Sequence, residues 1–250
     1  MYKQTFSLFL FLGLVTSCLA MFVETRELKD IKKHLRHEHD WVICDLDNTL
    51  VKMIDDRGRD QWFDAMINYA KARGVPPELA TAKILQLYFS LHLEKNLQLT
   101  EVDAHELIIH LQAAGKKVIA LTLRSLPLKD RTVQQLAQLN IAFSKIIPHD
   151  EVAIEGFKDA RYAHGILFCS GNNKGDVLMR FLDQQGHAPR SIIFVDDKKK
   201  YLDMVQKHAH ERKIEFLGFR YGGCDEEVAS FMLSSADKDW IHQQFPIQSV

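Results

Sequence analysis

The chain has 250 residues, 46% of them apolar and 26% charged, which is a globular composition with room for one domain with an insertion or for two small domains. Its formal net charge is −1, which excludes the strongly basic character typical of nucleic-acid-binding proteins, so we expect no nucleic-acid partner. Its four cysteines follow neither a metal-ligand nor a disulfide-framework spacing, and Cys44 and Cys169 lie in apolar runs where buried thiols are expected.

The first twenty residues are typical of a secretory signal peptide. Lys3 precedes an apolar run over residues 6–15, and small residues follow it. This run is too short to span a membrane, and no other stretch approaches the roughly eighteen apolar residues that a span needs. We therefore expect a periplasmic or secreted protein, with no transmembrane span once residues 1–20 are removed. Residues 15–18 also resemble the lipobox of bacterial lipoproteins, so anchoring through an acylated Cys18 is the alternative.

The first half of the mature chain contains one strand followed by helices. Ile31 and Leu35 have helical spacing, so a short amphipathic helix is expected within residues 22–40. The apolar residues 42–44 predict a buried strand that ends in Asp45 and Asp47. A polar loop or hairpin flap is expected over 52–60, and helices over 61–72, 77–92 and 100–115. Thr100 and the acidic residue three positions later form a capping-box pattern for the last of these helices.

The second half alternates strands and helices. A strand over 117–122 ends in the hydroxyl of Thr122, and Arg124 follows it. Lys174 lies in a polar loop over 170–175, and the strand over 191–195 ends in Asp196 and Asp197. Further strands are expected at 141–147, 165–169 and 214–219, an irregular segment or hairpin at 148–163, and helices at 128–139, 176–184, 199–211, 226–233 and 238–243.

This alternation predicts an α/β fold, a three-layer Rossmann-like parallel sheet with helices on both faces. The helices within residues 52–99 are expected to form a small helical cap inserted into a hydrolase domain over 21–250. Helices that pack on the core without gating a site are the alternative. In a parallel sheet all strand carboxyl ends share one edge, so Asp45, Asp47, Thr122 and the Asp196-Asp197 pair are expected to meet there.

That edge has the composition of a phosphate-processing site. Several crowded carboxylates need a cation, and oxygen ligands with room for water and phosphate favour Mg²⁺. Asp45 can then attack phosphorus, and Asp47 can protonate the leaving oxygen and later activate water. Thr122 and Lys174 offer a hydroxyl and a positive charge to the phosphate. Arg124 is a candidate for substrate contact, with a solvated loop residue as the alternative.

The set resembles the haloacid dehalogenase (HAD) superfamily of phosphohydrolases. The Asp60-Gln61-Trp62-Phe63 stretch and the loop over 170–175 are similar to a poorly characterised secreted bacterial branch of that superfamily. The resemblance covers roughly residues 41–219 and rests on the Asp45-Leu46-Asp47-Asn48-Thr49 motif, on Leu121-Thr122, on Lys174 and on Asp196-Asp197, in that order. It implies that Asp45 is the nucleophile and a metal ligand, and that Asp47 is the acid/base whose backbone carbonyl also binds Mg²⁺.

By the same resemblance the third metal ligand is Asp197, with Asp196 as the second choice. Many family members carry a further acidic or amide residue four positions after the metal-binding aspartate, whereas this chain has Tyr201 there. Asp196 or Asp203 is therefore the alternative for completing the metal site.

The sequence thus predicts a Mg²⁺-dependent phosphatase that hydrolyses a small phosphorylated substrate. Two alternatives stay open. One is a secreted binding or effector protein built on the same scaffold, and the other is a phosphotransferase that passes the phosphoryl group to an alcohol.

Overall fold

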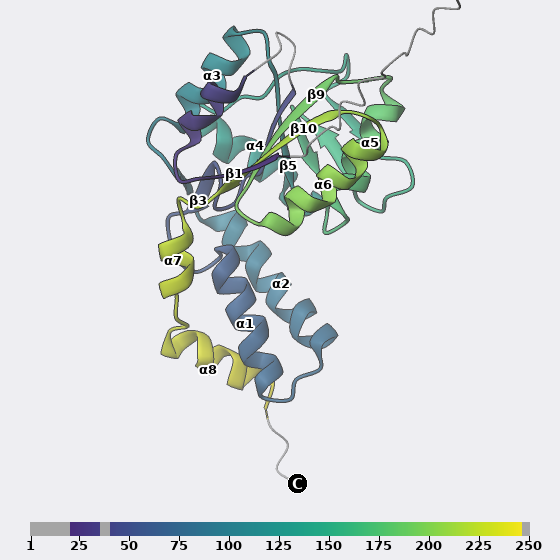
Figure 1. The fold of residues 1–250 in the computed structure, drawn as a ribbon. Helices are drawn as coiled ribbons and strands as arrows, with labels where there is room; N and C mark the ends of the chain where they lie inside the picture. The colour runs from purple at the N-terminus through teal and green to yellow at the C-terminus, as the bar shows by residue number, and fades with distance from the viewer. Residues whose placement is uncertain (1–20, 36–40, 247–250) are drawn as a thin grey trace, which may run out of the picture.

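The computed structural model describes residues 21–35 and 41–246 (Figure 1). The expected signal peptide and Cys18 lie outside these residues. Within the described part, no helix is both long and apolar enough to cross a membrane. Cys44, Cys169 and Cys224 are buried free thiols, as expected for the first two.

An eight-stranded sheet forms the centre of the molecule, with the strand order β1-β10-β9-β2-β5-β8-β7-β6. The first six strands in this order run parallel, and β7 and β6 add an antiparallel edge. The strands are β1 (Met21–Thr25), β2 (Trp41–Cys44), β5 (Lys117–Thr122), β6 (Glu151–Ala153), β7 (Arg161–Ala163), β8 (Ile166–Phe168), β9 (Ser191–Asp196) and β10 (Glu215–Tyr221). The predicted α/β class with a mostly parallel sheet is confirmed.

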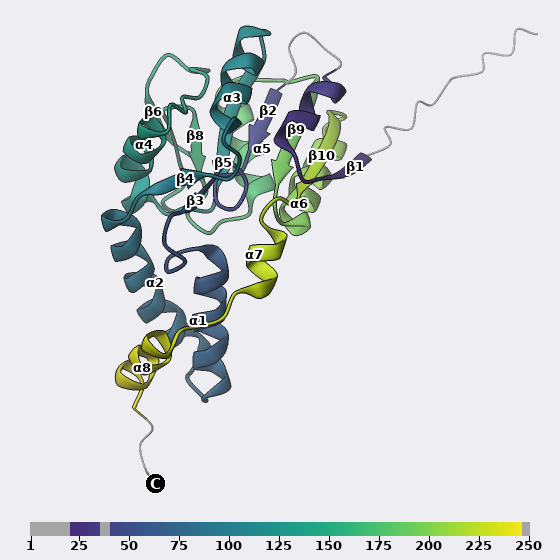
Figure 2. The ribbon, with the colours of Figure 1, turned by 90° about the vertical axis from the view of Figure 1, so that its left-hand side faces the viewer.

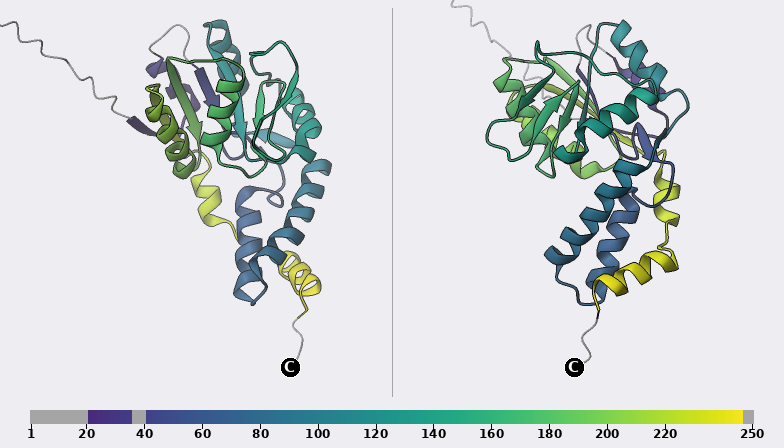
Figure 3. Two further views of the ribbon diagram at one scale, coloured as in Figure 1. Left: turned by 90° about the vertical axis from the view of Figure 1, so that its right-hand side faces the viewer. Right: turned by 180° about the vertical axis from the view of Figure 1, so that it is seen from behind.

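Helices cover both faces of this sheet, which makes three layers (Figures 2 and 3). Side chains alternate along a strand, so β2 directs Val42 and Cys44 into one core and Trp41 and Ile43 into the other. The helices on the first face are η1 (Leu28–His34, a 3₁₀-helix), α3 (Ala104–Ala113) and α4 (Lys129–Gln138, preceded by the 3₁₀ turn η2, Leu126–Leu128). The helices on the second face are α5 (Lys174–Gln184) and α6 (Lys199–Glu211).

Three further helices form a lobe below the carboxyl edge of the sheet, which we call the helical lobe. It consists of α1 (Asp60–Ala72), α2 (Pro77–Glu94) and α8 (Ser235–Gln244), and α7 (Asp225–Ser230) lies along the connection from the sheet to α8 (Figures 1 and 2). The helices α1 and α2 belong to the expected insertion over 52–99. The chain enters that insertion through β3 (Val51–Met53) and leaves it through β4 (Leu97–Leu99). These two strands pair with each other in an antiparallel ribbon.

The helix α8 reaches this lobe from the other end of the chain. The indole Nε1 of the buried Trp62 donates to Asp237 Oδ1 across 3.1 Å, and α8 therefore packs on α1. Ser234 caps α8 in a capping box with Asp237. Between sheet and lobe, Lys52 and Arg59 both pair with Glu227 of α7. The lobe is thus tied to the core by the β3–β4 ribbon and by the C-terminal segment.

Two of the expected elements differ in the structure. The short helix expected within residues 22–40 is present as the 3₁₀-helix over Leu28–His34, but residues 21–25 before it form the edge strand β1, paired in parallel with β10. Leu28 and Ile31 are both fully buried at i, i+3, the spacing of a 3₁₀-helix. The strand expected over 141–147 is absent, because β5 already has β2 on one side and β8 on the other. The segment contacts β5 only near the first residues of that strand, where Ser144 and Val118 form two hydrogen bonds.

Smaller differences concern element ends. The helix expected from residue 100 begins at Ala104, because the Thr100 hydroxyl donates to the Thr49 carbonyl instead of capping a helix. The helix α5 begins two residues earlier than expected, with Asn173 as its N-cap, so Lys174 stands on its first turn. The other predicted helices and strands, including the hairpin within 148–163, are confirmed.

Candidate active site

The site begins with a tight loop that follows β2. The Leu46 carbonyl accepts the backbone N–H groups of Thr49, Leu50 and Val51, and Asn48 adopts a left-handed conformation with φ of 56°. This loop holds Asp45 directly at the strand end, where its N–H donates to the Val195 carbonyl of β9. Because β2 lies between β5 and β9, Asp45 occupies the centre of the sheet's carboxyl edge.

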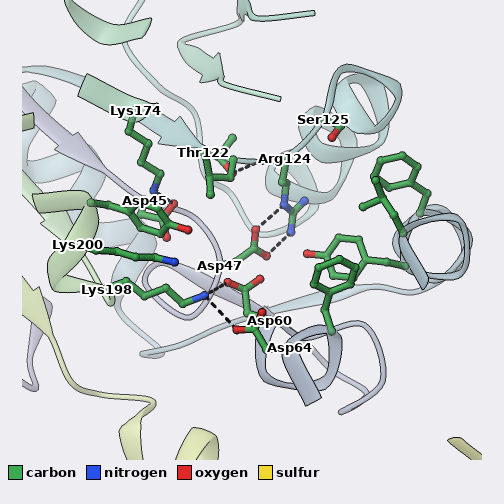
Figure 4. A pocket seen from close by; sticks show the side chains of 16 residues that line it. Asp45, Asp47, Asp60, Asp64, Thr122, Arg124, Ser125, Lys174, Lys198 and Lys200 are labelled. Carbon is green, nitrogen blue, oxygen red and sulfur yellow. Dashed lines mark hydrogen bonds and ion pairs between the residues drawn. The ribbon is translucent and has the colours of Figure 1, made fainter. Parts of the chain in front are cut away.

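Lys174 is the closest partner of Asp45. Its Nζ lies 2.6 Å from Asp45 Oδ1 and 2.7 Å from Asp196 Oδ2, and its side chain is only 1% exposed (Figure 4). Burial opposes the lysine charge, but the two carboxylates hold its pKa well above the ordinary value. Lys174 Nζ also lies 4.6 Å from the centre of the Tyr201 ring, a cation–π distance. The lysine is therefore a fixed positive charge beside Asp45.

Three carboxylates converge at this point. One oxygen each of Asp45, Asp196 and Asp197 lies within 4.8 Å of the others, and all three residues are buried. Burial and the neighbouring acids raise the pKa of Asp197 to about 9, and burial raises the pKa of Asp45 to about 7 although Lys174 opposes it. One lysine cannot neutralise three carboxylates, so the donor set is suited to a divalent cation with oxygen ligands such as Mg²⁺.

Thr49 organises this carboxylate cluster. Its hydroxyl lies 3.4 Å from Asp45 Oδ2 and accepts the backbone N–H of Asp197 across 3.1 Å. The last residue of β5, Thr122, is 1% exposed, and its Oγ1 accepts the Arg124 N–H. Asp203 lies apart from the cluster on an exposed turn of α6, where it pairs with Lys199.

Asp47 forms an ion pair with Arg124. Arg124 Nε and Nη2 donate to the two Asp47 oxygens across 2.9 and 2.7 Å (Figure 4). The third guanidinium nitrogen donates to Thr132 Oγ1, and the arginine is 4% exposed. Burial disfavours the Asp47 charge, but the Arg124 guanidinium outweighs it and lowers the pKa of Asp47 to about 2. Asp47 is therefore ionised at neutral pH.

A cavity of about 200 Å³ lies between these residues and the helical lobe. Asp45, Asp47, Thr122, Arg124 and Lys174 line its sheet side. Across it, side chains of α1 and α2 form the opposite wall, and Lys198, Lys200 and Tyr201 lie at its edge. Lys198 Nζ bonds Asp60 Oδ2 of α1 across 2.6 Å, so one ion pair joins the sheet edge to the helical lobe (Figure 4).

The structure thus brings the expected site residues together, except for the alternative metal ligand Asp203. Asp45, Asp47, Thr122, Arg124, Lys174, Asp196 and Asp197 all lie at one edge of the sheet. Arg124 lines the cavity, where it was expected as a candidate for substrate contact, and its guanidinium also pairs with Asp47. At 4% exposure it is not the solvated loop residue of the alternative. Sequence reasoning missed Lys198, Tyr201 and Thr49 as site residues. Thr49 is part of the motif that follows Asp45 and could have been found there. Lys198 contacts Asp60 of α1 and Tyr201 contacts Lys174 of α5, and the residues around them in the sequence do not indicate these contacts.

Comparisons with known proteins give a family and several relatives. Residues 24–246 match the family described as "Protein of unknown function (DUF2608)". The chain is 26% identical over 246 residues to a Chlamydia trachomatis serovar D protein named "Putative outer membrane protein", covering 97% of this chain and 93% of that protein. A similarly named Chlamydia pneumoniae protein is 26% identical over 226 residues, with 87% and 84% covered.

Two solved structures were also found to be similar. One is a haloacid dehalogenase-like family hydrolase from Streptococcus pneumoniae, with 14% identity, a TM-score of 0.40, and 72% of this chain and 94% of that chain covered. The other is the class C acid phosphatase from Bacillus anthracis with tungstate bound, with 15% identity, a TM-score of 0.33, and 89% and 85% covered.

Proposed function

The chain belongs to the DUF2608 family, and we propose that it is a Mg²⁺-dependent phosphatase of the haloacid dehalogenase type, hydrolysing a small phosphomonoester through an aspartyl-phosphate on Asp45. One observation carries this proposal. Asp45 lines a cavity at the centre of the sheet edge, with Lys174 on one of its oxygens and with Asp196 and Asp197 beside it.

In the first step an oxygen of Asp45 attacks phosphorus, and the bond between phosphorus and the leaving oxygen breaks. Lys174 and the Thr122 hydroxyl are the groups of this chain that hold the phosphoryl oxygens. Asp45, Asp196, Asp197 and the Asp47 carbonyl would hold Mg²⁺, which supplies charge neutralisation for both the carboxylates and the phosphate. Asp47, protonated for this step, donates its proton to the leaving oxygen, and the alcohol departs.

In the second step water attacks the phosphorus of the aspartyl-phosphate, and Asp47 accepts its proton. The phosphorus–Asp45 bond breaks, which releases phosphate and the free carboxylate. Arg124 keeps Asp47 ionised at neutral pH, the state that a general base requires. The first step needs Asp47 in its protonated form, which the ion pair with Arg124 disfavours. The geometry of the site therefore favours Asp47 as the general base of the second step.

We extend the proposal to the helical lobe, which acts as a cap. Its helices α1 and α2 form the wall of the cavity opposite Asp45, and closure over a bound phosphate would exclude water other than the attacking molecule. The Lys198–Asp60 ion pair holds this wall against the sheet edge. The cap differs from the expected insertion over 52–99 because α8 contributes to it.

The decisive experiment is the replacement Asp45→Asn, assayed with an aryl phosphate at saturating Mg²⁺. We expect kcat/KM to fall roughly a thousandfold or more, as for other covalent nucleophiles. Asp203→Asn is the matched control, because it makes the same change on the exposed face of α6 and keeps full activity. Retention of more than a few per cent of activity by the Asp45 variant would remove it as the nucleophile.

The binding or effector alternative predicts a different result with transition-state analogues. A phosphatase of this type is stabilised by beryllium fluoride or vanadate with Mg²⁺, because ligands that bind only the folded state raise its melting temperature. An unchanged melting temperature together with no hydrolysis would favour the contact-based function. A phosphotransferase would instead yield a new phosphate ester when an alcohol such as ethanol is added, and product analysis detects it.

We also infer that the protein acts outside the cytoplasm, through the signal peptide expected over 1–20. The chlamydial relatives whose names place them at the outer membrane support this inference. Fractionation of a Gram-negative host expressing the full chain tests it, with Cys18→Ala to separate lipid anchoring from release. Protein that stays in the cytoplasm with its first residues intact would refute it, and label from palmitate lost on Cys18→Ala would establish the anchor.

A further inference from the structure

The wall of the cavity that faces the catalytic carboxylates is apolar and aromatic. It is formed by Phe63 of α1 and by Leu85, Tyr88 and Phe89 of α2. The two helices pack on each other, but these four side chains are only partly buried. Partly exposed aromatic side chains that line a cavity leave apolar surface for a ligand to cover.

The side chains of this wall differ in how they pack. Phe63 and Tyr88 pack against the hydrophobic core as well as lining the cavity, whereas Leu85 and Phe89 belong to neither core of the described residues. Leu85 and Phe89 are four positions apart and therefore lie on one face of α2, whereas the buried Ile84 and Leu91 lie on another. Leu85 and Phe89 thus leave apolar surface at the cavity that packing in the core does not explain.

The rings are fixed relative to one another. Phe63 and Tyr88 meet edge to face with their centroids 5.1 Å apart, and the Tyr88 ring lies 4.1 Å from the ring of the buried His92. His92 is itself held by a 2.8 Å hydrogen bond between its Nε2 and the Gly58 carbonyl. A preorganised aromatic surface binds a flat apolar group with little loss of side-chain entropy.

Two polar residues that line the cavity near this wall are engaged elsewhere. Asp60 pairs with Lys198, and the Arg124 guanidinium is shared by Asp47 and Thr132. Asp64, Ser125, Lys200 and the Tyr88 hydroxyl also line the cavity. A polyhydroxylated group seated on the side chains of Phe63, Leu85 and Phe89 would lose hydrogen bonds to water, and these three side chains offer none in return. An apolar group gains from the same burial.

From these observations we propose that the substrate is a phosphomonoester whose leaving group carries a single flat, apolar ring seated on Phe63, Leu85, Tyr88 and Phe89. The inference rests on the proposed phosphatase function and adds the class of its substrate. The cavity volume of about 200 Å³ sets the size. The same cavity also has to hold the phosphoryl group beside Asp45, and benzene alone needs about 150 Å³, so the volume limits the leaving group to one ring.

The test compares two primary alkyl esters, 2-phenylethyl phosphate and glucose 6-phosphate, with the mature protein and saturating Mg²⁺. Both leaving groups are alcohols, which avoids the intrinsic reactivity of phenyl esters. Burial of about 100 Å² of ring at about 25 cal/mol per Å² corresponds to a preference in kcat/KM of roughly 70-fold for the phenylethyl ester. Equal turnover, or preference for glucose 6-phosphate, would overturn the inference while leaving the phosphatase function intact.

Two variants of α2 locate the preference. Phe89→Ala is expected to reduce the ratio of the two kcat/KM values at least about fivefold, mainly through KM for the phenylethyl ester. Leu93→Ala is the matched control, because Leu93 lies on the same helix but is 52% exposed, and it keeps the wild-type ratio. An unchanged ratio in Phe89→Ala would also overturn the inference. Failure of the wild-type protein to hydrolyse either ester would instead refute the proposed function, and the inference with it.

Discussion

Replacing Arg124 by Met tests whether the guanidinium holds Asp47 in place. Arg124 makes two hydrogen bonds to Asp47, of 2.9 and 2.7 Å, and a third to Thr132 of 3.0 Å, with its side chain 2% exposed. The variant leaves the Asp47 carboxylate largely buried and unpaired. Removal of one partner of a buried ion pair costs about 3–5 kcal/mol of unfolding free energy.

A second estimate of this cost comes from the pKa of Asp47. A value of about 2 in the fold, against an ordinary 3.8, corresponds to about 2 kcal/mol of net preference for the ionised carboxylate in its present surroundings. This preference already includes the opposing effect of burial, so the attraction by Arg124 alone is larger. Both estimates therefore predict a loss of at least about 2 kcal/mol at pH 7.

The measurement is urea unfolding at pH 7 of a double-mutant cycle. We expect Asp47→Asn combined with Arg124→Met to be more stable than Arg124→Met alone, because the unpaired charge is gone. Arg131→Met is the control, since Arg131 makes its hydrogen bonds to Lys95 and Asn96 at the surface and its loss should cost at most about 1 kcal/mol. An Arg124 variant as stable as this control, or a strictly additive cycle, would refute the reasoning.

Three further predictions concern other parts of the molecule. Burial lowers the pKa of His92 to about 4, so below pH 6.5 the unfolded chain takes up a proton that the fold excludes, and the contribution of His92 to stability should fall by about 2 kcal/mol from pH 7 to pH 5. In urea unfolding, the free energy of the wild type relative to His92→Gln should therefore fall by this amount between the two pH values, and a constant difference would contradict it. Trp62→Phe removes the hydrogen-bond donor to Asp237, so it should lower the unfolding free energy by about 2–4 kcal/mol and speed hydrogen exchange at the amides of α8. Unchanged protection of these amides would show that Trp62 does not hold α8 on α1. Mg²⁺ at about one hundred times its Kd should stabilise the wild type by about 2.7 kcal/mol, and Asp197→Asn should lose most of this gain while Asp203→Asn keeps it.

The candidate site was predictable to a large extent because its determinants are local. A strand that ends in Asp45 and another that ends in Asp196 can be recognised from short apolar runs, and parallel strands bring their carboxyl ends to one edge whatever the chain length between them. The register β2–β9, which pairs Cys44 with Val195, then places the two carboxylates side by side.

The N-terminal strand and the missing strand at 141–147 show where local patterns fail. Both segments are apolar enough for a strand, and the difference lies in the sheet. β1 finds a free edge at β10, whereas both edges of β5 are taken by β2 and β8. Competition for an edge depends on the whole strand order and leaves no trace in a window of residues.

The sequence by itself determined the α/β class, the strand-end carboxylates and the chemistry that they favour, because strand and helix periods and the residues at strand ends are read within a few positions. Only the tertiary structure decided that Arg124 is engaged by Asp47, that Lys198 bonds α1, and that α8 completes the helical lobe. Each of these contacts joins residues 77 or more positions apart. Their pairing follows from the packing of whole elements, which local propensity and periodicity do not specify.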